Sequence, residues 1–412
     1  MSKNIWIFNH YVQPPSLGKE QRHSNFANHL IKKGYKVSVF YSSQIHNQPI
    51  NMISDNKKFK VTTENSIKYI AIKTRPYENS GKQRVLNMLD FYLGLNKVIK
   101  KNINEFGKPD VIYASSVHPL TLVAGIRIAK KLNVPCVCEV RDLWPLTLVK
   151  MDRIREGQFI TRLLYFLEKW IYKKADRLIF TMQGGPNYIT DQGWEGKVDI
   201  NKIHNINNGV DLEKFERNAQ LYKVENILDE DSFIVNYTGA LGQANMVGTI
   251  IEAAEIIQKQ TSKKVMFEIY GDGPKRKKYE EYLKEKEINN VNFRGRVESK
   301  YIPNILSKGN VNVITGKNSE LYKYGFSQNK FFTYLASGRP MISNREVHNL
   351  LEKTGSGKIV KPESPSALAE GILEFYDMKE QEYSNYCINA AKLAGDYDYG
   401  KLTDKLIKVL FD

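Results

Sequence analysis

Short apolar segments that are typical of buried strands alternate with longer amphipathic segments along the chain. In the first half, strands are expected at residues 4–9 and 35–41 with a helix at 20–33 between them, and the same alternation recurs up to residue 181. Strands that are joined by helices pair in parallel, with helices on both faces of the sheet. The pattern therefore predicts an α/β fold.

The alternation begins again in the second half, which predicts two domains. Strands are expected at 233–237 and 265–270, and the C-terminal segment is expected to be helical. A chain of 412 residues is too long for one compact core and suits two domains of about 200 residues each. We predict Rossmann-like domains at 1–200 and 201–385, with the helices of 386–412 packing back towards the first domain. Ligands are expected in a cleft between the domains, at the carboxyl ends of their strands.

The positive charge of the chain is concentrated in its first half. The formal net charge is +16, and residues 1–200 hold 31 Lys and Arg against 16 Asp and Glu, whereas residues 201–412 hold 30 against 29. Such a bias indicates an anionic partner for the first half: a membrane surface, a nucleic acid or a phosphorylated substrate. The basic residues are dispersed without a recognisable nucleic-acid-binding module, so we expect no nucleic-acid partner.

Two segments of the first half combine apolar residues at helical spacing with basic residues. Residues 150–177 contain eight Lys and Arg and four Asp and Glu, with Phe159, Leu163 and Phe166 among the apolar positions, and residues 82–101 combine leucines with a basic end. Both patterns are typical of a helix that lies in an anionic membrane surface. A helix that packs on a core and turns a basic side to solvent gives the same pattern, so both interpretations stay open.

The composition also predicts where the protein works. No stretch is apolar enough for a transmembrane helix, and the first residues lack the apolar region of a secretory signal. Three cysteines are too few for a disulfide framework. We therefore expect a cytoplasmic protein that attaches peripherally to the inner face of the membrane through its N-terminal half.

Glycines follow two of the strands that are expected in the second half. Gly239 and Gly242 lie between a strand and a helix, and Gly271 begins a similar turn that ends at Pro274. Glycines at such turns let backbone N–H groups approach a phosphate, which the positive end of the next helix also attracts. A tight turn without a ligand has the same sequence, so the glycines alone do not decide between a phosphate site and a plain turn.

The densest signal is the segment 327–342, which contains Lys330. This lysine is expected near the start of a helix, where a cation is slightly unfavourable because the backbone N–H groups already carry positive charge. Its position therefore favours a ligand role over that of a solvated lysine. A diphosphate that approaches from the cleft fits such a cation.

Polar residues follow two strands of the first half. His118 comes after the strand expected at 111–114, at the edge where an α/β sheet presents its ligands, although a single histidine is often a structural hydrogen-bonding residue. Arg141 and Asp142 follow the next strand. They either pair with each other or face the cleft.

Two short acidic strings match the D-x-D pattern with which some sugar-nucleotide enzymes hold a divalent cation. They are Asp229-Glu-Asp231 and Asp396-Tyr-Asp398. Neither string follows a strand at the position where the sheet would present ligands, and both are expected to face solvent. We therefore predict no metal site and no cofactor.

Taken together and in order, these motifs resemble the retaining glycosyltransferases of family 4, which have the GT-B fold of two Rossmann-like domains with a cleft between them. Within that family the resemblance is to bacterial capsule and O-antigen enzymes, including N-acetylfucosaminyltransferase-like members. The resemblance spans nearly the whole chain. It rests on Gly18 and on the segments 141–145, 208–211, 237–239, 271–274 and 329–340.

The resemblance implies a metal-independent transferase that moves a sugar, an N-acetylated hexosamine or deoxyhexosamine, from a UDP-sugar to a lipid-linked or polysaccharide acceptor with retention of configuration. The C-terminal domain would bind the nucleotide-sugar and the N-terminal domain the acceptor. In this family the leaving phosphate helps to deprotonate the incoming hydroxyl. The implied catalytic residues are His118, Lys330 and Asp142, and the implied donor-binding residues are Gly18, Gly239, Gly242, Gly271, Arg294, Asn329 and Thr333.

The chain departs from the family at the donor site. Family members commonly carry two glutamates separated by seven residues, where this chain has Gly325 and Thr333, and an arginine and a lysine after the first strand of the second domain, where Ala240 and Val247 stand. Arg294 is then expected to share the binding of the phosphate with Lys330. The departures leave two alternatives open: a non-catalytic GT-B subunit that binds a partner enzyme or glycan, and a sugar-nucleotide 2-epimerase with the same fold.

Overall fold

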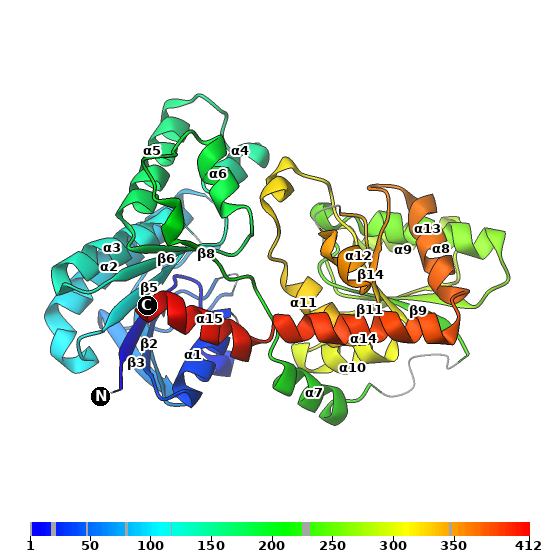
Figure 1. The fold of residues 1–412 in the computed structure, drawn as a ribbon, viewed down its shortest axis with the longest axis horizontal. Coiled ribbons are helices and arrows are strands. Elements are labelled where there is room, and N and C mark those ends of the chain that lie inside the picture. The colour runs from blue at the N-terminus through cyan, green and yellow to red at the C-terminus, as the bar shows by residue number, and fades with distance from the viewer. Residues whose placement is uncertain are drawn as a thin grey trace. The chain divides into compact units, whose positions relative to one another are not determined.

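The chain forms two compact units, shown in a computed structural model (Figure 1). The first unit comprises Met1–Asn207 and Tyr399–Asp412, and the second comprises Asn208–Asp398. Each unit is an α/β structure around its own sheet, which confirms the predicted pair of Rossmann-like domains. The structure describes residues 2–17, 22–46, 48–78, 81–116, 118–224, 231–345 and 348–412.

The first unit is built on an eight-stranded sheet in the order β3-β4-β2-β1-β5-β6-β7-β8. β3 pairs antiparallel with β4, and every other neighbouring pair is parallel. Because β8 is the last strand of this sheet, the first unit extends to Asn207 and does not end at residue 200. The strands are β1 (Asn4–Phe8), β2 (Lys36–Ser42), β3 (Phe59–Glu64), β4 (Ile67–Ile72), β5 (Val111–Ser115), β6 (Cys136–Val140), β7 (Arg177–Phe180) and β8 (Ile203–Asn205).

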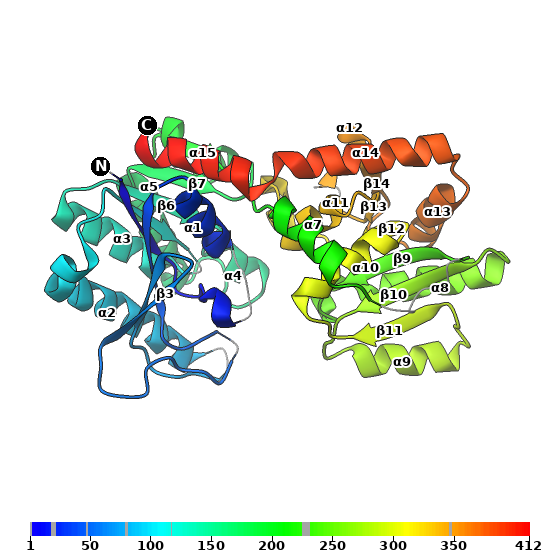
Figure 2. The ribbon, with the colours of Figure 1, turned by 90° about the horizontal axis from the view of Figure 1, so that it is seen from below.

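Helices cover both faces of this sheet (Figures 1 and 2). α3 packs between α2 and α5 on one face, and α1 packs against α15 on the other. Side chains alternate along β1, so that Ile5 and Ile7 join the core beneath α1 and α15, whereas Trp6 contacts the ring of Phe106 at the end of α2. The helices are α1 (Arg22–Lys32), α2 (Lys82–Phe106), α3 (Pro119–Leu132), α4 (Leu146–Lys150), α5 (Phe159–Lys174), α6 (Gly185–Asp191) and α15 (Tyr399–Phe411).

The second unit is built on a six-stranded, fully parallel sheet in the order β11-β10-β9-β12-β13-β14. Its buried apolar residues form one cluster with α8 and α13 and another with α11 and α14. The strands are β9 (Phe233–Thr238), β10 (Val265–Tyr270), β11 (Val291–Gly295), β12 (Val311–Ile314), β13 (Met341–Ser343) and β14 (Gly357–Ile359). The helices are α7 (Leu212–Leu221), α8 (Val247–Gln260), α9 (Arg276–Glu285), α10 (Ile302–Lys308), α11 (Asn329–Ala336), α12 (Leu350–Thr354), α13 (Pro365–Tyr376) and α14 (Glu380–Asp396).

The C-terminal helices divide between the two units, which corrects the expectation that residues 386–412 pack together on the first domain. α14 buries Leu393 and Ala394 in the cluster that contains Phe331 of α11, so it belongs to the second unit. Only α15 belongs to the first unit, where Leu406 lies in the core cluster. Each helix belongs to the unit in which its apolar side chains are buried, because removing apolar surface from water is favourable.

Candidate active site

α11 holds Lys330 against the turn that follows β9. The Lys330 Nζ atom lies 4.5 Å from the centre of the Tyr237 ring and 3.4 Å from its hydroxyl oxygen. The hydroxyl of Tyr334 accepts a hydrogen bond from the backbone N–H of Thr238 at 2.7 Å and lies 3.1 Å from its carbonyl oxygen, to which it donates. Residues four apart share one side of a helix. One face of α11 therefore fixes both the turn and the ammonium group.

Two glycines, one in this turn and one in the turn after β10, have positive φ and are needed for different reasons. At Gly239, where φ is +154°, an added Cβ atom would lie 2.7 Å from the Nζ atom of Lys330. At Gly271, where φ is +143°, an added Cβ would lie 1.8 Å from the carbonyl oxygen of Gly239. Gly239 thus leaves space for the ammonium group, whereas Gly271 lets two turns touch. The second contact accounts for Gly271 without any ligand.

An open cavity of about 710 Å³ lies at the carboxyl ends of β9 and β10. Its lining includes Gly239, Gly271, Asp272, Arg296 and Ser299. Ligands of α/β sheets bind at this end of the strands, and the volume is in the range of small-molecule sites. Because Gly239 also lies against Lys330, the cavity is next to the ammonium group of Lys330.

A second cation, which was not expected from the sequence, is near enough to Lys330 to lower its pKa. Arg345 follows β13, is only 4% exposed, and places its guanidinium carbon 4.5 Å from the centre of the Tyr322 ring. Its Nε and Nη1 atoms have no hydrogen-bond partner within the described ranges. Gly316 makes room for it, because an added Cβ there would lie 1.7 Å from Nη2.

The two cations influence each other. Burial, together with the positive charge of Arg345, lowers the pKa of Lys330 to about 8. Neither side chain forms an ion pair with a carboxylate in the part of the chain that the structure describes. Positive charge that is removed from water without a counter-ion is unfavourable, and an anionic ligand would relieve this cost. The pair is therefore suited to bind a phosphate or diphosphate.

Arg294, the residue expected to share the phosphate, has another partner. Its Nε atom donates to Oε2 of Glu268 at 2.5 Å and its Nη2 atom donates to Oε1 at 3.1 Å. The carboxylate of Glu268 is almost completely buried, and it is held to β11 by Asn292 as well. Arg294 is thus engaged in a structural ion pair, and the structure does not bring it together with Lys330.

The other predicted donor residues of the second unit contribute less to the cavity. Thr333 donates its hydroxyl to the carbonyl oxygen of Asn329, four residues earlier in α11, at 3.1 Å. Asn329 itself is exposed at the first position of that helix. Gly242 has no atom within 4 Å of an added Cβ and does not line the cavity. Gly18 lies outside the described residues.

His118 is buried in the first unit within a chain of hydrogen bonds. Asn87 donates its side-chain amide to the carbonyl of Arg75 at 2.6 Å, which turns Oδ1 of Asn87 towards Nε2 of His10 at 2.7 Å. His10 Nε2 then carries the proton, so its Nδ1 accepts from Nε2 of His118 at 2.9 Å. This sequence of donors leaves Nδ1 of His118 as an acceptor.

The surroundings of His118 keep its imidazole uncharged. Burial and the neighbouring His10 and Arg84 side chains lower the pKa of His118 well below its usual value. Its Nδ1 atom has no hydrogen-bond partner among the described residues. A neutral imidazole with a free acceptor can receive a hydrogen bond from a hydroxyl group, but it cannot supply a proton from a charged form.

Asp142, the third residue with an implied catalytic role, is exposed in the first unit. It lines a small cavity together with Trp144 and Glu168, among others. The ion pair between Arg141 and Asp142 that the sequence allowed is not formed; the backbone N–H of Arg141 donates to the hydroxyl of Ser116 at 3.0 Å. Burial of its carboxyl group raises the pKa of Asp142, although the residue as a whole is exposed.

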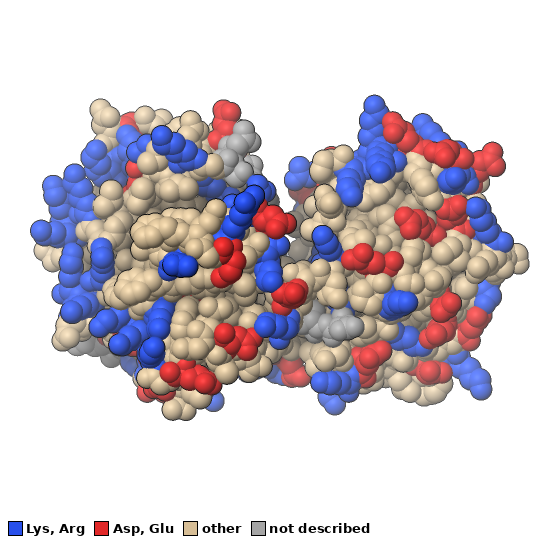
Figure 3. Space-filling model, turned by 90° about the horizontal axis from the view of Figure 1, so that it is seen from above, with Lys and Arg blue, Asp and Glu red and all other residues tan. Residues whose placement is uncertain are grey.

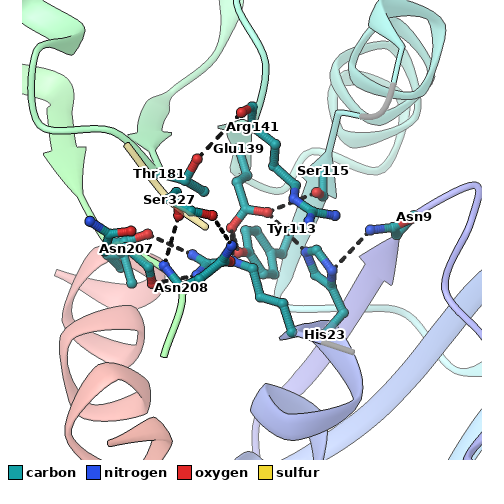
Figure 4. A network of polar contacts seen from close by, with 12 residues as sticks. Asn9, His23, Tyr113, Ser115, Glu139, Arg141, Thr181, Asn207, Asn208 and Ser327 are labelled. Carbon is teal, nitrogen blue, oxygen red and sulfur yellow. Dashed lines mark hydrogen bonds and ion pairs between the residues drawn. The ribbon is translucent and has the colours of Figure 1, made fainter. Parts of the chain in front are cut away.

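Glu139, at the end region of β6, is the centre of the polar network in Figure 4 and was also missed from the sequence. It accepts hydrogen bonds from Nε of Arg22 at 2.8 Å, from Oγ of Ser115 at 2.8 Å and from the hydroxyl of Tyr113, and lies 3.0 Å from Nε2 of His23. Burial alone would raise the pKa of Glu139, but Arg22 and His23 hold it well below its usual value. The carboxylate is therefore charged at neutral pH.

Arg22 extends this network to the end of the first unit. Its Nη1 atom donates to the carbonyl of Asn207 at 2.5 Å, and its Nη2 atom donates to the carbonyl of Ile206 at 2.8 Å. All of the donors of a guanidinium lie in one plane, so one side chain can bind the carboxylate and these carbonyls together. The network thus fastens α1 to β6 and to the last residues before the second unit.

The described residues contain no group of three or more His, Cys, Asp or Glu that is placed to hold a metal ion. Of the two D-x-D strings, Asp229 lies outside the described residues. Asp398 accepts a hydrogen bond from the backbone N–H of Leu212 at 3.1 Å and so has a structural contact.

Two Rossmann-like units in one chain are characteristic of the GT-B class of glycosyltransferases. Residues 18–214 match the model of Glycosyltransferase Family 4, and residues 232–378 match that of Glycosyl transferases group 1. The two matches together cover most of the chain, which belongs to the GT-B glycosyltransferases. Comparison with curated protein sequences gives no match.

Solved structures with the same fold include proteins of several activities. A sucrose-phosphate synthase from Thermosynechococcus elongatus is 17% identical with a TM-score of 0.69, covering 99% of this chain and 98% of that chain. HepE from Anabaena, solved in complex with UDP, is 16% identical with a TM-score of 0.67, covering 99% of each chain. An α,α-trehalose 6-phosphate synthase from Burkholderia multivorans is 13% identical with a TM-score of 0.71, covering 100% of this chain and 98% of that chain. These similarities show the fold.

Proposed function

We propose that this glycosyltransferase moves a sugar from a UDP-sugar to a lipid-linked or polysaccharide acceptor, with retention of configuration, in capsule or O-antigen synthesis. The observation that carries the proposal is the pair of cations, Lys330 and Arg345, which has no carboxylate partner in the described chain and of which Lys330 lies next to the cavity at Gly239. The UDP that is bound to HepE supports the choice of nucleotide. The transferred sugar is proposed to be an N-acetylated hexosamine or deoxyhexosamine.

The cations fit the electrostatic demand of the reaction. The bond between C1 of the sugar and the diphosphate oxygen breaks, a bond forms between C1 and the acceptor hydroxyl oxygen, and the hydroxyl proton passes to the leaving diphosphate. Negative charge grows on the diphosphate, and preorganised positive groups stabilise that charge most in the transition state. Lys330 and Arg345 together supply the charge that a divalent metal supplies in other transferases, so we propose that no metal is needed.

The first unit is proposed to bind the acceptor. Its excess of Lys and Arg suits a carrier lipid with phosphate groups at the inner face of a membrane. We propose that Nδ1 of His118 accepts a hydrogen bond from a sugar hydroxyl, because this nitrogen is unprotonated and has no hydrogen-bond partner among the described residues. Asp142 lines a small cavity of the first unit, and we propose that its carboxyl group contacts the acceptor.

A second candidate function is a subunit that binds the nucleotide without transferring a sugar. It is favoured by the sequence of α11. Thr333 stands there where the family has a glutamate, and its hydroxyl donates a hydrogen bond to the backbone of the same helix. A sugar-nucleotide 2-epimerase is a related alternative, because it needs the donor but no acceptor. Product analysis separates the three functions: transfer gives a glycosylated acceptor, epimerisation gives an altered sugar without acceptor, and a binding subunit gives neither.

The donor site is tested by titration calorimetry with UDP and with uridine. We expect UDP to bind at least about tenfold more tightly than uridine, because only the diphosphate can contact the two cations. UMP is expected to lie between them. No detectable binding of millimolar UDP would contradict the proposed donor and would favour a partner-binding subunit.

The affinity for UDP is expected to fall as the pH rises from about 7 to about 9. Because the pKa of Lys330 is about 8 in the free protein, the ammonium is charged below pH 8 and neutral above it, and only the charged form attracts a phosphate. The expected loss is up to about tenfold. Tyr237, which contacts the ammonium, stays protonated because burial raises its pKa far above this range. Calorimetry at several pH values measures the effect, and Lys330→Met is expected to abolish the pH dependence while uridine binding stays constant.

A further inference from the structure

A cluster of large apolar side chains lies on the surface of the first unit. Its members follow α4 or lie on the outer side of α5, and their exposed fractions run from 47% to 83%. We call this cluster the α5 ridge. It consists of Met151, Phe159, Ile160, Leu163 and Phe166.

The α5 ridge is not the side of the helix that packs on the core. Ile171 and Tyr172 are buried on the inner side of α5, where Glu168 accepts a hydrogen bond from the hydroxyl of Tyr172 at 2.6 Å. Phe159 and Phe166 are seven residues apart, so they lie on the same side of the helix, away from that packing. The core-facing interpretation of this segment therefore explains only part of its apolar residues. A surface patch of several large, exposed apolar side chains marks an interaction surface.

Positive charge predominates around the α5 ridge. α5 lies at the top of the first unit in Figure 1, and Figure 3, which views the molecule from above, shows uncharged tan areas on that unit with more blue Lys and Arg than red Asp and Glu around them. Residues 150–177 hold eight Lys and Arg against four Asp and Glu, and one of those acids, Glu168, is buried. The exposed basic residues of this segment include Arg153, Arg155, Arg162, Lys173 and Lys174.

We propose that the α5 ridge inserts into the surface of an anionic lipid bilayer while the surrounding Lys and Arg bind the lipid headgroups. An apolar strip with a basic border has the charge pattern of helices that lie in a membrane surface. Among the described residues, no helix is both long enough and apolar enough to cross a bilayer, so the contact is at the surface. The proposal names the partner of the first unit and does not depend on sugar transfer.

The full-length protein is tested by sedimentation with vesicles of phosphatidylcholine that contain about 30% phosphatidylglycerol. We expect the protein to bind these vesicles, to bind pure phosphatidylcholine at least tenfold more weakly, and to dissociate at high salt. The double variant Phe159→Ser/Phe166→Ser is expected to weaken binding at least tenfold. The matched control is Ile388→Ser, which removes a side chain of the second unit that is 61% exposed and is expected to leave binding unchanged.

Further readouts keep the result interpretable. UDP affinity of the double variant, measured by calorimetry, is expected to equal that of the wild type, because the substituted side chains belong to the first unit and the cations to the second. Phe159→Trp is expected to show fluorescence quenching by brominated lipid, which reports insertion. Absence of vesicle binding by the wild type, or equal binding by the double variant, would overturn the proposal. A wild-type dimer that the double variant dissociates, without vesicle binding, would assign the α5 ridge to a second copy of the chain instead.

Discussion

Replacing Lys330 by methionine is expected to lower the rate of UDP-sugar consumption at least about 100-fold. Methionine keeps an unbranched apolar chain that can lie over the Tyr237 ring but removes the ammonium group. Removal of one preorganised charge that stabilises a developing anion typically costs a factor of 100 to 1000, or about 3–4 kcal/mol. The rate is measured as release of UDP in the presence of acceptor, or as donor hydrolysis in its absence. Arg345→Met is expected to act in the same direction.

The matched control for this experiment is Lys263→Met. Lys263 also lies over a tyrosine ring of the second unit, at 5.0 Å from the centre of the Tyr376 ring, but it is paired with Asp377. This variant is expected to change the rate less than about twofold. A loss of less than tenfold for Lys330→Met, about 1.4 kcal/mol, would show that the ammonium does not stabilise the leaving group.

Replacing Glu139 by leucine is expected to lower the free energy of unfolding by about 3–5 kcal/mol. The side chains of Glu139 and Arg22 are 0% and 2% exposed, so the substitution leaves a guanidinium buried without its counter-ion. Tyr113 and Ser115 lose their hydrogen-bond acceptor at the same time. Urea denaturation of the full chain, followed by a spectroscopic signal of the first unit, measures the change.

Two further variants separate the buried charge from a general loss of ion pairs. Glu139→Leu/Arg22→Met removes both charges and is expected to recover about 1–3 kcal/mol relative to the single variant. Asp404→Leu removes the partner of Lys33 in an exposed pair of the same unit and is expected to cost less than about 1 kcal/mol. Equal stability of Glu139→Leu and the wild type would refute the role of the network in holding α1, β6 and the end of the first unit together.

Most of the fold can be predicted from the sequence because strand-helix alternation is a local property. The antiparallel pair of β3 and β4 is an exception, since no strand was expected there from the sequence. Its turn, Asn65-Ser66, has positive φ at both residues, which allows a tight hairpin without the glycine that usually signals one. β3 is also partly exposed, so its apolar content is low.

The site is predicted less well, because the arginine that belongs to it and an arginine that does not differ only in their neighbours. Arg294 and Arg345 are both arginines close to strand ends, and no local pattern distinguishes them. The pairing of β10 with β11 brings Glu268 opposite Asn292, so Arg294 meets a buried carboxylate. Nε and Nη1 of Arg345 have no hydrogen-bond partner in the described chain, and this property becomes visible only when the strands are assembled.

Lys330 could be predicted because its position in the helix was itself unusual. A cation in the first turn of a helix is detectable from one segment of sequence, whereas a buried arginine without a partner is not. The same reasoning explains why Glu139 was missed. Its partners Arg22 and Ser115 come from distant parts of the chain, and only the parallel sheet gathers them.

The path of the chain makes the second unit an insert within the first. The chain leaves the first unit after Asn207 and re-enters it at Tyr399 to supply α15. The two ends of the insert are neighbours, since the backbone N–H of Val210 donates to the carbonyl of Tyr397 at 3.0 Å. A gene fragment that stops at residue 207 would therefore encode an unfinished core, whereas the second unit could be exchanged between relatives by cutting at these two adjacent chain segments.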